Sequence, residues 1–190
     1  MNKVTARAIA VLILLTGCAS EPARLNHYLL HSTSEAEAEA AKPGEHYINM
    51  GQVILPDYLK QRGLAYQTSA TQVQLSSQHL WAEPLQSGVV QVLERGLWKQ
   101  AAITVVPASA RAGEPVASLS IQVDNFIASY RGDVIFSGKY WLETESGSPL
   151  VRRFAYTLAL ERDGYDHTVE KMREALHLLA RDVAAQVVKE

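Results

Sequence analysis

The 190-residue chain has few of the features that would assign it to a class at once. Its only cysteine, Cys18, leaves no second thiol for a disulfide within the chain. The apolar run at residues 8–16 has nine residues, whereas a helix needs about 20 to cross a bilayer. Basic residues are not in excess, with 18 Lys and Arg against 20 Asp and Glu, which argues against a nucleic-acid partner. An ordinary hydrophobic core must therefore stabilise the fold, and this length suits one domain.

Sequence patterns that carry catalysis or bind metals are also missing. The chain has no G-x-S-x-G elbow, no P-loop and no G-x-G-x-x-G fingerprint. His27 and His31 would share one face of a strand, but two ligands without a third make a poor metal site. The six histidines are therefore predicted to lie at the surface or at sheet edges. Asp163 precedes Gly164, and an Asp-Gly pair is typical of a turn, so Asp163 is predicted to be a turn residue. We predict no catalytic residues, no metal site and no cofactor, and we do not expect an enzyme.

The single cysteine lies directly behind the N-terminal apolar run. Lys3 and Arg7 are the only charged residues before Cys18, and small residues follow the run, as in a secretory signal peptide. The sequence LTGC at residues 15–18 matches the lipobox of bacterial lipoproteins, in which the thiol is lipidated and the chain is cut before the cysteine. Ala19 stands where Asp would retain a lipoprotein at the inner membrane, which favours the outer membrane.

The lipobox divides the chain into three parts. We predict a lipoprotein signal peptide over residues 1–17, a lipidated tether over residues 18–26 and a single domain over residues 27–190. The signal peptide holds two basic residues and no acidic ones, which leaves 16 basic against 20 acidic side chains in the mature chain. Buried acyl chains, at about 0.8 kcal/mol per methylene, would hold such a protein firmly at a membrane.

Hydrophobic periodicity predicts an α+β fold, sandwich-like, with a mixed, mostly antiparallel sheet and two main helices packed on it. The acidic, low-complexity segment Ser32–Glu45 is predicted to be a loop. One helix is expected to begin at Pro84 and another, with Asp166 as its N-cap, to run to the C-terminus with an apolar stripe. Strands are predicted at His27–Leu30, Tyr47–Leu55, Ala65–Thr68, Gln72–Ser76 and Ile103–Val106, and an antiparallel meander at Ala117–Asp124, Val134–Leu142 and Leu150–Leu160.

The segment VILPDYLKQRGLAYQTSATQVQLSSQHLWAEPL, residues 53–85, places large aromatic residues beside turn residues. The side chains of such residues either fill the hydrophobic core or act as rigid anchors in an interface. Together with the lipobox, the Tyr-Leu-Leu of the first strand and the later stretches YRGDVIFSGKYWL and DGYDHTV, this segment resembles the PqiC (YmbA-like) lipoproteins. These form the auxiliary lipoprotein family of ABC-type and MCE-type transport systems.

The resemblance implies a fold similar to the N-terminal domain of TolB and no enzymatic activity. It also implies a lipoprotein of the outer membrane that faces the periplasm. Its partners would be an MCE-domain periplasmic tunnel protein (PqiB-like) and the inner-membrane subunit of the same system, which together move lipids between the membranes and support envelope integrity. Cys18, as the lipidated residue, is the one position to which the family pattern assigns a chemical role.

Tyr58, Leu59, Tyr66 and Trp81 are the predicted partner interface. Because tunnel proteins form rings, a homo-oligomer around the tunnel is also considered. The alternative function is a periplasmic lipid-binding carrier lipoprotein with an internal apolar pocket. The strong alternation of the strands argues against such a carrier, because a domain with one sheet and two helices usually fills its own core. A hydrolase would need a Ser–His pair that the sequence does not show.

The lipobox interpretation predicts where a variant without the thiol will be found. A chain carrying Cys18→Ser behind a conventional cleavable signal peptide should fold normally and leave the membrane fraction, because nothing remains to be acylated. Fractionation of cells expressing the wild type and the variant measures this. If the variant stays membrane-bound at high salt, the lipobox interpretation is wrong.

Overall fold

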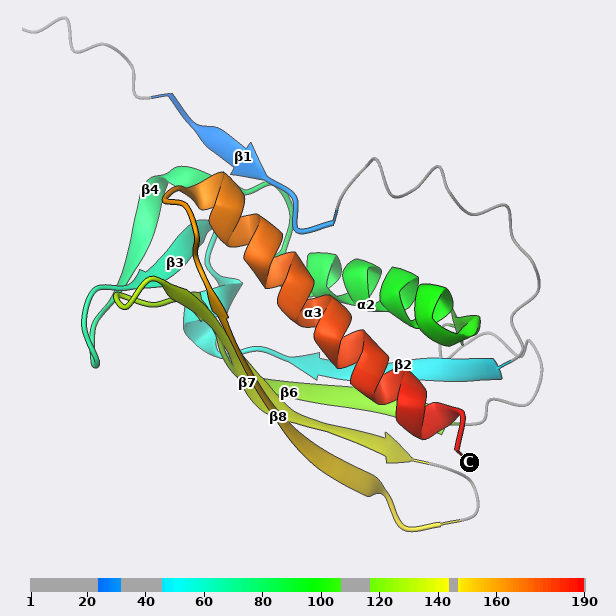
Figure 1. Ribbon diagram of the computed structural model, residues 1–190. Coiled ribbons are helices and arrows are strands. Elements are labelled where there is room, and N and C mark those ends of the chain that lie inside the picture. The colour runs from blue at the N-terminus through cyan, green and yellow to red at the C-terminus, as the bar shows by residue number, and fades with distance from the viewer. Residues whose placement is uncertain (1–23, 32–45, 107–116, 144–146, 190) are drawn as a thin grey trace, which may run out of the picture.

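A computed structural model describes residues 24–31, 46–106, 117–143 and 147–189. The predicted signal peptide, the lipobox with Cys18 and the predicted loop Ser32–Glu45 lie outside these described residues. The domain itself is covered from its first strand to the end of its last helix (Figure 1).

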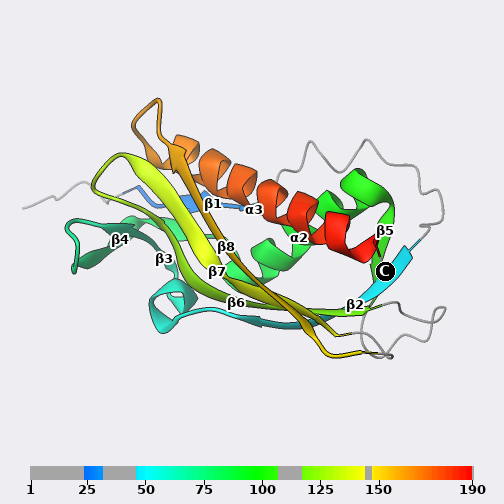
Figure 2. The same cartoon turned by 60° about the horizontal axis from the view of Figure 1, so that its bottom comes forward.

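The described residues form one eight-stranded sheet with two α-helices on one of its faces (Figure 2). A short 3-10 helix, η2, separates the second strand from the third. The helices are α2 (Leu85–Ala101) and α3 (Tyr165–Val187), and η2 covers Asp57–Lys60. The strands are β1 (Asn26–Tyr28), β2 (His46–Ile54), β3 (Gly63–Gln67), β4 (Val73–Trp81), β5 (Ile103–Val106), β6 (Ala117–Ala128), β7 (Asp133–Glu143) and β8 (Leu150–Ala159).

The long strand β6 organises the sheet. On one side it begins the predicted antiparallel meander with β7 and β8. On its other side the sheet forks into two arms. In one arm, β2 runs parallel to the first half of β6 and pairs in turn with β5. In the other arm, β3 pairs with the last residue of β6 and with β4, and β4 pairs with β1. The prediction of a mixed, mostly antiparallel sheet with two helices is confirmed.

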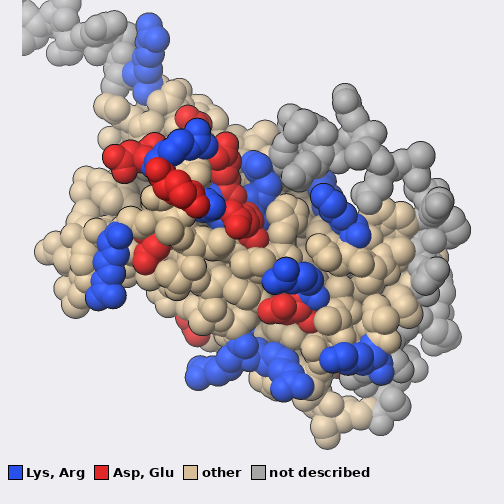
Figure 3. Space-filling view, in the orientation of Figure 1, with Lys and Arg blue, Asp and Glu red and all other residues tan. Residues whose placement is uncertain are grey.

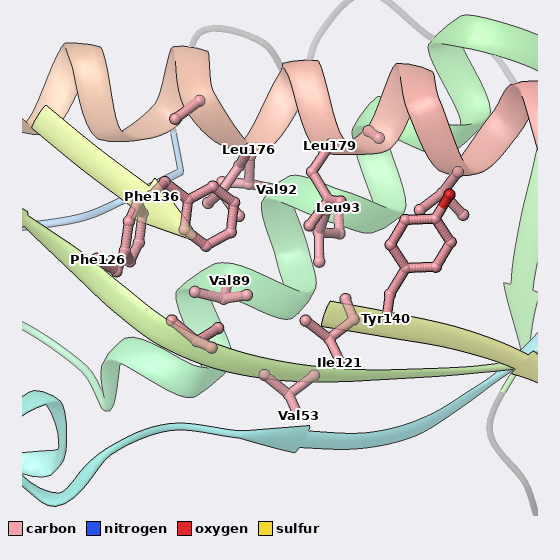
Figure 4. Packing of buried hydrophobic residues seen from close by; sticks show 14 of the residues in the cluster. Val53, Val89, Val92, Leu93, Ile121, Phe126, Phe136, Tyr140, Leu176 and Leu179 are labelled. Carbon is pink, nitrogen blue, oxygen red and sulfur yellow. The ribbon is translucent and has the colours of Figure 1, made fainter. Parts of the chain in front are cut away.

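The hydrophobic core fills the space between the sheet and the helices (Figure 4). Leu119, Ile121 and Val123 point inward from β6 with the expected alternation. A bulge after Val123 then shifts the alternation, so that Phe126 also points inward and meets Phe136 with ring centroids 4.6 Å apart. The predicted stripe of α3 is buried against this layer, with Leu176 and Leu179 fully enclosed.

The two helices pack on each other as well as on the sheet. The sequence places Gly96 inside α2, where glycine costs about 1 kcal/mol relative to alanine. The structure supplies the reason, because a Cβ at Gly96 would lie 2.6 Å from the Cβ of Ala180 on α3. Close approach of the helices therefore requires glycine there. The hydroxyl of Tyr156 on β8 also donates to the carboxylate of Asp182 on α3.

Three local predictions were wrong. The N-cap of α3 is Gly164 rather than Asp166, because the chain leaves β8 through a turn with φ of 115° at Gly164, which favours glycine. Asp166 lies in the first turn instead, where a carboxylate suits the helix dipole. His167 is buried, not at the surface, because it is enclosed by a cluster of charged side chains. The strand predicted at Gln72–Ser76 continues to Trp81, since β1 pairs with its far end.

Candidate functional site

An apolar hollow of about 270 Å³ is lined by residues of β3, the end of β6 and the first turns of α3. These elements lie toward the left of Figure 1. Aromatic side chains make up much of its wall, and it is partly open to solvent. Its lining residues are Leu59, Leu64, Ala65, Tyr66, Gln67, Trp81, Phe126, Ala128, Ser129, Tyr130, Gly164, Tyr165, Thr168 and Met172.

The structure brings three of the four predicted interface residues to this hollow. Tyr66 is half-buried in its wall, whereas Leu59 and Trp81 are only 3% and 5% exposed. Leu59 was predicted to lie in the partner interface, but η2 turns its side chain into the core. Leu59 and Trp81 therefore contribute to the floor of the hollow rather than to an exposed surface.

Tyr58 lies outside the hollow and has a structural partner. A hydrogen bond joins its hydroxyl to the backbone amide of Phe126, in the part of β6 between the two arms of the sheet. Burial raises the pKa of Tyr58, and this bond partly opposes the rise. The half-buried Tyr58 therefore closes a stretch of β6 edge that neither β2 nor β3 covers.

Tyr165, at the start of α3, connects the hollow to the first strand. Its ring stacks on His79 of β4 with centroids 3.8 Å apart and meets Tyr66 edge-on at 6.3 Å. His79 in turn forms a 2.8 Å hydrogen bond with the hydroxyl of Tyr28 on β1. The chain that leads from the predicted tether is thus fixed beside the hollow. Nε of Arg173 also donates to the carbonyl oxygen of Leu30 at 2.7 Å.

Charged side chains cluster over the first half of α3 (Figure 3). His167 lies between Glu161 and Glu170, with nitrogen–oxygen distances of 2.8 and 3.1 Å. The pKa of Glu161 falls to about 2, chiefly because Lys171 donates to its carboxylate and His167 also bonds it. This cluster fixes the loop between β8 and α3, which forms one side of the hollow.

Within the described ranges, no group of three or more His, Cys, Asp or Glu residues is arranged to hold a metal ion. Neither α2 nor α3, in the part of the chain that the structure describes, contains an apolar stretch long enough to span a membrane.

Sequence reasoning missed Tyr130 and Tyr165, which line the hollow with Tyr66. Tyr130 lies in the turn after β6, and Tyr165 is the first residue of α3, so neither lies where periodicity indicates the direction of a side chain. The only available signal was that both occur in the two later stretches that carried the family resemblance.

A family model described as an ABC-type transport auxiliary lipoprotein component matches residues 28–184 of the chain. The chain belongs to this family. The match begins in β1 and ends within α3, so the family pattern covers the sheet, both helices and the hollow. The family resemblance seen in the sequence is confirmed.

Curated relatives in the family carry the name intermembrane transport lipoprotein PqiC. The chain is 31% identical over 173 residues to the Escherichia coli (strain K12) protein, and the alignment covers 91% of each chain. The Shigella flexneri protein of the same name matches equally well.

Solved structures show the same fold. The crystal structure of an uncharacterized protein, 27% identical, superposes with a TM-score of 0.72 and covers 86% of this chain and 99% of that one. A protein from Xanthomonas campestris, 14% identical, gives a TM-score of 0.61 with coverage of 79% and 89%. The second likeness concerns the fold alone.

The structural role of Tyr58 can be separated from a role in binding. Tyr58→Phe should lower the free energy of unfolding by about 1–2 kcal/mol, because the amide of Phe126 loses its partner. Tyr66→Phe is the matched control: no hydrogen bond of this hydroxyl is seen among the described residues, and the expected change is below about 0.5 kcal/mol. Urea unfolding measures both. Unchanged stability of the Tyr58 variant would refute the structural role.

Proposed function

We propose that this chain is a non-enzymatic lipoprotein of the outer membrane that docks the periplasm-spanning tunnel protein of an MCE-type intermembrane lipid-transport system. The observation that carries the proposal is the 31% identity, over 91% of both chains, to a protein named intermembrane transport lipoprotein. Family membership over residues 28–184 supports a role as an auxiliary component rather than as the transporter itself. In this role the protein tethers the distal end of the tunnel and supports envelope integrity.

The proposed location rests on the N-terminal sequence. Lipidation of Cys18 would anchor the chain, and Ala19 favours transport to the outer membrane. Tyr28 in β1 is the tenth residue after Cys18, and a stretch of ten residues spans at most about 36 Å. The domain would therefore stay close to the membrane, facing the periplasm, where a tunnel protein from the inner membrane could reach it.

The proposed docking surface is the rim of the apolar hollow, which includes Tyr66 and Tyr130, together with the neighbouring Tyr58. Tyrosine is among the residues that most often anchor interfaces, since its side chain offers a large rigid surface. Tyr130 is 48% exposed and Tyr66 is half-buried, so both offer ring surface to a partner. Leu59 and Trp81 support the rim from beneath. The partners are the MCE-domain tunnel protein (PqiB-like) and its inner-membrane subunit, and several copies of this chain would surround a ring-shaped tunnel.

Purification from detergent-solubilised envelopes tests this function. The wild-type chain should co-purify with an MCE-domain protein, and Tyr66→Ala should reduce its recovery about tenfold, because the rim loses an anchor. Tyr47→Ala removes another half-buried tyrosine, on β2 in the other arm of the sheet, and should leave recovery unchanged. The proposal fails if no MCE-domain protein accompanies the wild type and deletion of the gene leaves envelope permeability unchanged. Equal recovery with Tyr66→Ala and Tyr47→Ala would remove the rim as the docking surface.

A further inference from the structure

The last strand of the meander, β8, leaves one edge of the sheet without a neighbouring strand. It pairs with β7 along its whole length, from Leu150 to Ala159, and with no other strand of the described chain. In Figure 1 it forms the lower margin of the sheet. β8 has ten residues and contains neither a proline nor a bulge, two features that commonly protect a free edge. An edge of this kind can accept an extended segment of another chain as an added strand.

The hydrogen bonds of the meander show which backbone groups face the free edge. The amide of Leu160 donates to the carbonyl oxygen of Gly132 at 2.9 Å, and this pair continues the register of β8 with β7. Because bonding alternates along an antiparallel pair, even-numbered residues of β8 bond β7, and the amides and carbonyls of odd-numbered residues face the free edge. The odd-numbered residues, all exposed, are Val151, Arg153, Ala155, Thr157 and Ala159.

Basic side chains surround the first half of β8. Arg152 and Arg153 are both exposed, and they lie on opposite faces of the sheet because they are consecutive in a strand. Lys139 of β7 stands directly opposite Arg153, and like charges at opposite positions of a sheet repel each other. Arg181 adds an exposed cation on α3, next to the Asp182 that bonds Tyr156 of β8. Basic side chains accordingly gather along the lower side of Figure 3, where β8 runs in Figure 1.

These cations have no acidic partner among the described residues. None of the salt bridges within the described ranges includes Lys139, Arg152 or Arg153. β8 itself contains no acidic residue, and the carboxylate of Asp182 accepts from the hydroxyl of Tyr156. The mature chain as a whole is acidic, with 16 basic against 20 acidic side chains. The excess of positive charge is therefore local to the β8 edge.

We propose that the β8 edge binds an extended acidic segment of a partner protein, which adds a strand to the sheet. Main-chain hydrogen bonds to Val151, Arg153 and Ala155 hold the segment. Two consecutive acidic residues of the segment meet Arg152 and Arg153 on the two faces of the sheet, since side chains alternate along the added strand as well. A second copy of β8 fits this edge poorly, because pairing around Arg152 and Arg153 brings like charges together.

This inference goes beyond the proposed function and does not rest on it. Ala159 is paired with Asp133, so it lies at the end of β8 nearest the turn with Tyr130 and the hollow. Arg152 lies about 23 Å along the strand from Ala159. We therefore assign the edge to a second partner, which can bind while the tunnel protein occupies the rim of the hollow.

Hydrogen exchange in the presence of a designed peptide tests the edge. The mature Cys18→Ser chain, secreted behind a conventional signal peptide, is titrated with the capped peptide Val-Thr-Val-Glu-Glu-Val-Thr-Val, which reads the same in both directions and so suits either strand direction. With the peptide at about ten times its Kd, exchange at the amides of Val151, Arg153 and Ala155 should slow about tenfold. The amides of Phe154 and Tyr156, which bond β7, are the internal control and should change little.

Charge reversal tests the role of the two arginines. The wild type should bind the acidic peptide about tenfold more tightly than a peptide with two lysines in place of the glutamates. The double variant Arg152→Glu, Arg153→Glu should reverse this preference, and it should fold because both positions are exposed. The matched control, Arg62→Glu with Lys99→Glu, reverses the charge of two exposed residues outside the meander and should keep the wild-type preference.

A proline on the edge tests the strand pairing itself. Ala155→Pro should abolish binding of the acidic peptide, because it removes an outward-facing amide from the edge. The domain should still fold, since β7 does not use this amide. Circular dichroism checks the fold, and if this variant is unfolded, the exchange pattern and the double arginine variant decide the proposal.

The proposal is overturned if a large excess of the acidic peptide leaves exchange at the three outward amides unchanged, or if the double arginine variant keeps the preference for that peptide. It is also overturned if folded Ala155→Pro binds the peptide as the wild type does, since the edge would then be a basic surface that attracts acidic chains without strand pairing. None of these outcomes involves the tunnel protein, so the proposed function is tested separately.

Discussion

The packing of α3 across the β6–β7–β8 meander is the interaction on which the rest of the structure depends. Its buried stripe, including Leu176, Leu179 and Val183, closes the core over the sheet. The same helix begins at the hollow, where Tyr165, Thr168 and Met172 form one wall. The charged cluster around His167 and the Tyr156–Asp182 hydrogen bond fix the helix on the sheet at two points. One hydrophobic interface therefore both stabilises the domain and shapes its candidate site.

Much of this architecture could be predicted from local patterns. Period-2 alternation located the meander, and the apolar stripe located α3, because each element buries one face against the other. The fork of the sheet could not be predicted, since the pairing of β1 with the far end of β4 and of Tyr66 with Ala128 joins residues far apart in the chain. The bulge after Val123 also has no sequence signal, although it decides that Phe126 points inward.

The sequence pointed to some of the residues around the hollow, although their role as an interface stays a prediction. The predicted interface residues Tyr58, Leu59, Tyr66 and Trp81 combine large apolar surface with nearby turns, and the structure places all of them except Tyr58 around one hollow. Their exposure could not be read from the sequence, because it depends on how η2 and α3 cover them. Tyr130 occurs in an ordinary turn sequence, and only the folded domain shows that it lines the hollow. The proposed location depends on the N-terminal sequence, whereas the proposed docking surface depends on the folded domain.

The central claim is that the end of the domain with the hollow contacts the tunnel protein of a transport system. Photo-crosslinking in living cells tests it most directly, with a photoactivatable phenylalanine analogue placed at position 130, where Tyr130 is 48% exposed, or at the exposed Ala155 on the meander. The account predicts an adduct with an MCE-domain protein from position 130 and none from position 155. No such adduct from position 130, or equal adducts from both positions, would contradict it.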